Sequence, residues 1–211
     1  MNPTAIENET ATDTTDTTDT TDTTDAATKT AIDALLARLP KCDQPGRESR
    51  FTGPPAAIVD EVVGAALAGG RDTFTALAAR VVDAAGRGAD GDFRPGYALR
   101  MVALGIARGD DDAARRAFCA ALAARAGAAA APAGARAFLI GELEACGGAE
   151  SVAPLARLID DVELGDPALA ALVAIGEPSI AALRAARGGA SGARLLSIEH
   201  ALAALERLER D

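Results

Sequence analysis

Residues 136–187 contain an apolar pattern that recurs at a fixed distance along the chain. The pattern Leu-x-x-Cys-Gly, which begins at Leu143, returns as Leu-x-x-Ile-Gly, which begins at Leu172. The same step along the chain leads from Leu169 to Ile198. A fixed period of roughly 29 residues is typical of stacked helical repeats, in which no unit buries its apolar face alone. The period therefore predicts an all-α protein, built as an α-solenoid of stacked antiparallel helix pairs.

This stretch resembles the short HEAT-like repeats of bacterial proteins, which are also found in phycobilisome lyases and in many scaffold proteins. The positions that match the family pattern are Arg136, Leu143, Gly147, Val152 and Leu155 in the first unit, and Leu172, Ile175, Gly176, Ile180 and Leu183 in the second. Gly165 stands where the family has arginine, and Leu205 replaces the glycine of a third unit that contains Arg194. The resemblance is good over 136–187 and weaker over 93–127. It implies a HEAT-like solenoid and, because such repeats carry no catalytic residues as a class, it implies no reaction.

Composition divides the chain into three parts. Residues 1–29 hold a Thr-Thr-Asp tract with like charges at every third position and nothing to bury, so we expect a disordered tail. Residues 30–52 predict a short helix, with Thr30 as its N-cap and Pro40 as its end, followed by a linker. We expect this helix to dock on its own domain, although binding to something else stays open. Residues 53–211 are expected to form the solenoid.

Apolar spacing and turn residues predict the helices of the solenoid. Gly69-Gly70 should end the first helix, and Asp72 or Thr73 should cap the second. A turn at 90–92 precedes a longer helix that reaches about Arg108. Its inward residues are expected to be Tyr97, Met101 and Leu104. A helix capped by the acidic run 110–112 should then end near Gly127.

Within the repeats, glycine, serine and proline predict where helices begin and end. Pro132 should stand at a helix start, and Gly147-Gly148 permits a left-handed backbone at that helix's end. Ser151 is expected to cap the next helix, with Pro154 still in its first turn.

Charge and cysteine usage exclude several classes of protein. The net charge is −10, of which −6 lies within residues 1–30, and this argues against binding of a nucleic-acid backbone. Cys42, Cys119 and Cys146 form no C-x-x-C pair, so we expect buried free thiols rather than a disulfide framework or a zinc site. The N-terminus has no apolar signal region, and the apolar runs are too short for a membrane span. We therefore expect a cytoplasmic protein that does not bind membranes.

No group of residues predicts catalysis or a cofactor. His200 is the only histidine, and Glu199 beside it cannot share its helical face. No Ser-His-Asp or Cys-His arrangement is available with this one histidine. We expect no cofactor, no metal and no enzyme activity, and the function predicted is a scaffold module that binds a protein or peptide. The alternatives are an accessory subunit of a bilin lyase or other enzyme, and a purely structural spacer.

A candidate partner site follows from the resemblance, in which the second helix of each pair lines the concave side. The separation between Arg157 and Arg184 is close to one repeat, and Arg187 shares the face of Arg184. With Glu150 they are expected to point outward, and the arginines would form a ridge suited to an acidic peptide. The alternative is that they pair with Glu150, Asp160 and Asp161 as weak surface bridges.

Overall fold

The polypeptide is predominantly helical within residues 19–41 and 54–208, the part of the chain that the computed structural model describes. The α-helices are α1 (Asp19–Ala37), α2 (Ala56–Arg80), α3 (Arg94–Arg108), α4 (Asp112–Gly127), α5 (Ala133–Cys146), α6 (Ala149–Ala156), α7 (Gly165–Ile175), α8 (Ile180–Arg187) and α9 (Gly192–Leu208). Two 3₁₀ turns, η1 (Ala89–Gly91) and η2 (Glu177–Ser179), precede α3 and α8. The described ranges contain no strand, so the all-α class is confirmed.

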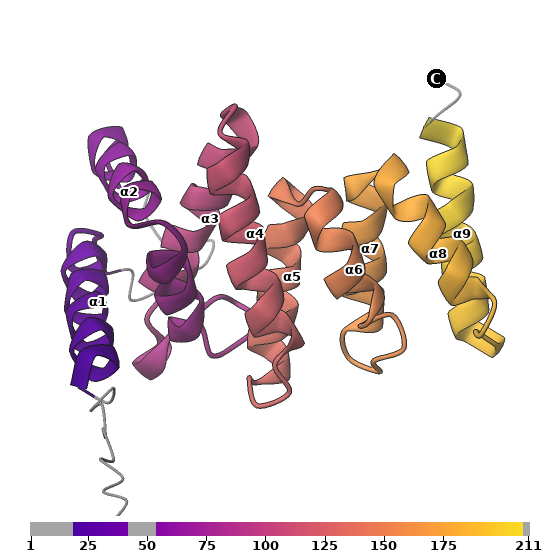
Figure 1. Cartoon of the computed structure of the whole chain (residues 1–211), viewed down its shortest axis with the longest axis horizontal. Coiled ribbons are helices and arrows are strands. Elements are labelled where there is room, and N and C mark those ends of the chain that lie inside the picture. The colour runs from indigo at the N-terminus through magenta and orange to yellow at the C-terminus, as the bar shows by residue number, and fades with distance from the viewer. Residues whose placement is uncertain (1–18, 42–53, 209–211) are drawn as a thin grey trace, which may run out of the picture.

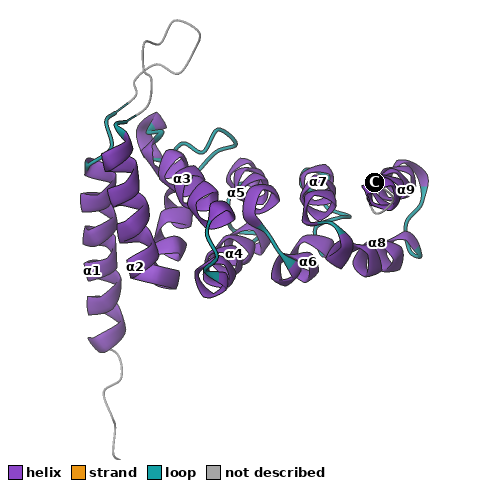
Figure 2. Ribbon diagram, turned by 90° about the horizontal axis from the view of Figure 1, so that it is seen from above, coloured by secondary structure: helices purple, strands orange, loops and turns teal. Residues whose placement is uncertain are grey.

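The helices from α3 onward lie in two rows (Figure 1). Figure 2 shows α3, α5, α7 and α9 in one row and α4, α6 and α8 in the other. Along each row every helix packs on the next, and neighbouring helices also pack between the rows. Helix α1 packs against α2 at the N-terminal end of the stack.

The core runs between the rows as a continuous band of small and aliphatic side chains. Alanine contributes many of the buried positions, which lets helices approach closely. The two large rings in this core, Phe74 of α2 and Phe118 of α4, meet edge to face with centroids 5.2 Å apart. Leu143 and Leu172, the equivalent leucines of the two clear repeats, are both fully buried. The apolar repeat positions are therefore core positions.

Helix α1 begins at Asp19, well before the expected start at Thr30, so that boundary was wrong. Helix formation is cooperative, and a docked segment can extend into neighbouring residues once its first turn exists. The rest of the expected tail, residues 1–18, lies outside the described residues. The expected docking of the 30–39 helix is confirmed, because its apolar side chains are buried: Ile32, Leu35, Leu36 and Leu39.

Deletion of residues 1–27 should leave the thermal midpoint unchanged within roughly 2 °C. Among the side chains described in α1, the first buried one is Ile32, and Ala27 is exposed, so we expect the deletion to remove no core contact. Deletion of residues 1–39 is the control, and it should lower the midpoint clearly because it removes the four buried side chains. Calorimetry on both truncations measures this. A drop of many degrees with the shorter deletion would show that residues before 28 contribute to packing.

Helix α2 is bent at Gly70, where the sequence predicts the end of one helix and the start of another. Gly70 has φ 58° and ψ −144°, a conformation that glycine adopts without the steric cost of a Cβ. The expected break is therefore present, but helical geometry resumes directly after it. Asp72 and Thr73 lie inside the second half of α2 rather than capping a separate helix.

Helix α3 buries a different face from the one predicted. Leu99, Val102 and Ile106 are its large buried residues, whereas the expected Tyr97, Met101 and Leu104 are only half-buried. The reason is a close backbone approach that the apolar pattern does not reveal. A Cβ on Gly96 would overlap the carbonyl oxygen of Gly86, so this glycine turns its own face toward the preceding loop. That contact sets the rotation of the whole helix.

Helix ends follow some sequence expectations and contradict others. Asp111 caps α4 by accepting hydrogen bonds from the backbone N–H groups of Ala113 and Ala114 at 3.0 and 2.9 Å, as the acidic run predicts. Ser151 does not cap α6, because Gly148 is the N-cap and Ser151 is buried in the first turn. Gly147 is extended, with φ −64°, rather than left-handed.

The glycines of the two repeats are required for different reasons. A Cβ on Gly147 would overlap the carbonyl oxygen of Leu143, so only glycine fits against the end of α5. Gly176, the equivalent residue after α7, has φ 88° and needs glycine for its conformation. The same residue at the same repeat position therefore meets two separate constraints.

The packing around Gly165 explains why a glycine stands at this position. Arg194 forms an ion pair of 2.7 Å with Asp166, and its guanidinium passes over the start of α7. A Cβ on Gly165 would lie 2.5 Å from Nη2 of Arg194 and would overlap the carbonyl oxygen of Ile159. Any larger side chain at this repeat position would displace the arginine of the next unit.

Candidate functional site

A groove with a volume of about 570 Å³ lies between α4 and α6. Its floor on the α4 side consists of residues with little or no side chain: Ala120, Ala123, Ala124 and Gly127. The α6 side contributes Glu150, Pro154, Arg157 and Leu158. The small residues of α4 leave the space open, and the α6 side supplies one cation and one anion. The groove can therefore hold an apolar side chain next to a charged one.

Proline shapes the α6 wall of this groove. Helix α6 begins at Ala149, so Pro154 lies inside the helix and not in its first turn, where the sequence analysis placed it. Proline has no N–H, and the carbonyl of Glu150 therefore loses its normal helical partner. The helix ends shortly afterwards, at Ala156. This leaves α6 short and Arg157 at its C-terminal end.

The three arginines of the expected ridge are all exposed. Arg157 is the C-cap residue of α6, and Arg184 and Arg187 lie in the last turn of α8. Helices α6 and α8 are consecutive in one row and pack on each other. Within the described residues, no ion pair involves any of these three arginines. We call Arg157, Arg184 and Arg187 the arginine ridge.

The alternative predicted that these arginines form ion pairs with Glu150, Asp160 and Asp161, and no such pair is present among the described residues. Asp161 is 3.5 Å from Arg136, and its Oδ1 also accepts hydrogen bonds from the backbone N–H groups of Glu163 and Leu164. These backbone hydrogen bonds, the one from Glu163 first, lower the pKa of Asp161. The acidic pair at 160–161 thus includes a turn-capping residue, a role that its sequence did not indicate.

Glu150 does not point outward as predicted. It is half-buried and forms an ion pair of 2.5 Å with Arg115 of α4, which also contacts Asp112 at 3.1 Å. A Cβ on Gly148 would overlap Nη1 of Arg115, so this glycine leaves the space through which the arginine reaches α6. Burial acts to raise the pKa of Glu150, but its own backbone N–H and Arg115 outweigh burial and lower it. Glu150 ties α6 to α4 at one end of the groove.

Two buried thiols lie beneath the same junction. Cys119 of α4 and Cys146 of α5 are free and buried, which confirms the prediction of buried free thiols for these two residues. Cys42 lies outside the described residues. The Cys119 thiol donates to the carbonyl oxygen of Cys146 at 3.7 Å. Sequence reasoning did not pair them, although their separation along the chain is close to one repeat.

A buried carboxylate is a second feature that the sequence did not reveal. Glu142 of α5 is fully buried, and its Oε1 accepts a hydrogen bond from Nε of Arg100 of α3 at 2.9 Å. The same oxygen forms an ion pair with Nη2 of Arg100 at 2.8 Å. Its Oε2 has no hydrogen-bond partner. Burial raises the pKa of Glu142, and Arg100 opposes that rise. A lone acidic residue in an apolar helix gives no signal of a partner so distant in the sequence.

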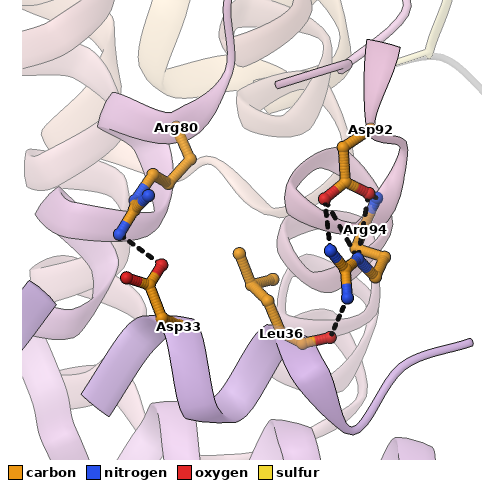
Figure 3. Close-up of polar contacts among 5 residues, drawn as sticks. All are labelled: Asp33, Leu36, Arg80, Asp92 and Arg94. Atoms are coloured by element: carbon orange, nitrogen blue, oxygen red, sulfur yellow. Dashed lines mark hydrogen bonds and ion pairs between the residues drawn. The ribbon is translucent and has the colours of Figure 1, made fainter. Parts of the chain in front are cut away.

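A larger cavity, of about 680 Å³, lies where the ends of α1 and α2 meet the 88–95 segment. Figure 3 shows two ion pairs among its lining residues: Asp33 pairs with Arg80 at 2.5 Å, and Asp92 pairs with Arg94 at 2.8 Å. Arg94 also donates to the carbonyl oxygen of Leu36 at 3.4 Å. The hydrogen bond from the Arg94 side chain lowers the pKa of Asp92. These contacts hold α1 on the stack, so we assign this cavity a structural role.

The remaining candidate residues do not form a further site within the described part of the chain. His200 is exposed on α9. Among the residues that the structure describes, no three His, Cys, Asp or Glu side chains are grouped so that they could hold a metal ion. None of the described helices combines the length and apolar character needed to cross a membrane.

Comparison with known proteins adds no assignment to this geometry. No protein-family model, no curated protein and no solved structure matches the chain.

Proposed function

We propose that the chain is a HEAT-like solenoid that acts as a non-catalytic scaffold module and binds an acidic peptide or protein segment along α4, α6 and α8. The sequence repeat and the two rows of packed helices support the solenoid. The observation that carries the binding proposal is the arginine ridge beside the groove. Arg157, Arg184 and Arg187 are exposed, form no ion pair among the described residues, and lie on two consecutive helices of one row in a chain of net charge −10.

The chemistry of the ridge favours a carboxylate partner. Arginine presents a planar group that pairs with a carboxylate through two parallel hydrogen bonds. The neighbouring groove is lined mainly by alanine and glycine, with Pro154 and Leu158, and suits an apolar side chain. A segment that alternates acidic and apolar residues would use both features. The overall negative charge would repel acidic segments from the rest of the surface and so favour this region.

The triple variant Arg157→Ala, Arg184→Ala and Arg187→Ala should weaken the binding of such a segment at least tenfold at about 0.15 M salt, because exposed charge pairs are individually weak but three are lost together. The matched control is the triple variant Arg71→Ala, Arg108→Ala and Arg207→Ala. It removes the same charge from exposed positions on other helices: α2, α3 and α9.

The probe is a fluorescent peptide selected for binding from a library of alternating acidic and apolar sequences, and fluorescence anisotropy measures the affinity. The control variant should bind like the parent chain. If both variants bind equally well, or if the selection yields no acidic peptide, the ridge is not the binding surface.

A further inference from the structure

A pair of thiols lies at the junction of α4, α5 and α6, apart from the arginine ridge. Cys119 stands in the middle of α4 with no exposed surface, and Cys146 is the last residue of α5 and is 6% exposed. Cys146 donates to the carbonyl oxygen of Glu142 at 3.3 Å, and Cys119 donates to the carbonyl oxygen of Cys146 at 3.7 Å. Both sulfur atoms therefore lie against the same last turn of α5.

We propose that Cys119 and Cys146 are a redox modification site, at which a low-molecular-weight disulfide converts the two thiols into a disulfide that joins α4 to α5. The contact brings the Cys119 sulfur to within 3.7 Å of the backbone of Cys146 on the neighbouring helix. A disulfide requires such closeness between the backbones of its two cysteines. The inference does not rest on the proposal that a peptide binds at the groove.

The reaction balances as two thiol–disulfide exchanges. The Cys119 thiolate attacks one sulfur of the small disulfide, whose S–S bond breaks and releases one small thiolate that takes up a proton. Cys146 then loses its proton to solvent and attacks the Cys119 sulfur, which releases the second small thiol. The two protein sulfur atoms are oxidised, and one external disulfide is reduced to two thiols.

The surroundings assign different roles to the two thiols. The interaction with the Cys146 side chain lowers the pKa of Cys119, despite its burial, and favours the thiolate that begins the exchange. The same interaction between the two side chains, together with burial, raises the pKa of Cys146, so this residue keeps its proton until the second step. The positive charge of nearby Arg115 opposes the rise in the pKa of Cys146. Glu150 acts to raise the pKa of Cys119 and so disfavours its thiolate.

Access to the thiols requires α6 to open locally. This helix has 8 residues, contains Pro154, and is tied to α4 through the Arg115–Glu150 ion pair. Short elements with few hydrogen bonds open at a lower free energy than the whole molecule. Loss of the Arg115–Glu150 ion pair, as in Glu150→Gln, should therefore speed oxidation.

The experiment uses the full chain with Cys42→Ser, which leaves only these two thiols. The folded protein is treated with oxidised glutathione, quenched with acid, denatured, alkylated with a maleimide and weighed by mass spectrometry. We expect no added maleimide and a mass lower by about 2 Da, the two hydrogens lost when one disulfide forms. Trypsin should then release residues 117–125 joined to residues 137–157, and a reductant should separate them.

Two outcomes would overturn the proposal. One is two alkylated cysteines after prolonged oxidation of the folded chain. The other is a product that contains only glutathione adducts or cross-links between molecules. A circular dichroism spectrum recorded under the same conditions shows that the chain stays folded. Glu150→Gln removes both the ion pair between α4 and α6 and the carboxylate that acts against the Cys119 thiolate, so it should speed oxidation on both counts.

Discussion

Leu172→Ala should lower the free energy of unfolding by about 2–5 kcal/mol, a large share of the roughly 5–15 kcal/mol typical of a domain. Leu172 has 0% exposure and lies in α7, which packs between α5 and α9. Removal of its branched end leaves a cavity that neighbouring helices can fill only partly. Chemical denaturation with fitted midpoints and slopes measures the change.

Leu196→Ala is the matched control for this substitution. Leu196 is 57% exposed on α9, so the same chemical change should cost no more than about 0.5 kcal/mol. Hydrogen exchange on the Leu172 variant should show loss of protection first in α7, α8 and α9, because stacked units depend on their nearest neighbours. An equal loss of protection from α2 to α9 would argue for one cooperative bundle instead.

Arg100→Met should cost about 3 kcal/mol at neutral pH, because the fully buried Glu142 carboxylate would lose its cation and its charge would stay in the core. Arg100 supplies both the hydrogen bond and the ion pair of that carboxylate. The expected value lies at the low end for buried pairs because the Arg100 side chain is 47% exposed and partly screened by water. Arg108→Met on the same helix is the control, since Arg108 is exposed, and it should change stability little.

The cost of Arg100→Met should depend on pH in a defined direction. Burial raises the pKa of Glu142 above its ordinary value of 4.5, so the folded protein holds this proton more tightly than the unfolded chain does. The contribution of Glu142 to stability is therefore complete below pH 4.5 and is lost as the pH rises through the raised pKa. Loss of Arg100 raises this pKa further, so the gap in stability between variant and parent should widen as the pH rises above 4.5.

The double variant Arg100→Met and Glu142→Gln separates the charge effect from lost packing. It should recover most of the lost stability and abolish the pH dependence of the difference, because no buried charge remains. A pH-independent cost in the single variant would mean that Arg100 acts through the packing of its aliphatic stem.

The candidate site was only partly accessible from the sequence. Helical spacing was enough to place Arg157, Arg184 and Arg187 on the outer surface, because exposure follows from the position of each residue relative to an apolar stripe. The ion pair of Glu150 could not be predicted from helical spacing. Its partner, Arg115, is distant in the sequence and reaches it only because Gly148 leaves room. Pairing between distant charged residues depends on such local space, which no pattern within one helix records.

The sequence by itself determined the helical class and the identity of the core leucines. These follow from periodicity, since an apolar residue at helical spacing must be covered wherever its helix lies. Turn residues likewise placed the bend at Gly70 and the cap at Asp111.

The tertiary structure alone decided the rotation of α3, the capping of α6 and the pairing of buried polar groups. In α3 two stripes compete, and the contact of Gly96 with the backbone of Gly86 selects the one that contains Leu99. Glu142 meets Arg100, and Cys119 meets Cys146, because α5 packs on both α3 and α4. These features depend on distances between backbones of different helices, and a repeat period fixes the order of helices but not those distances.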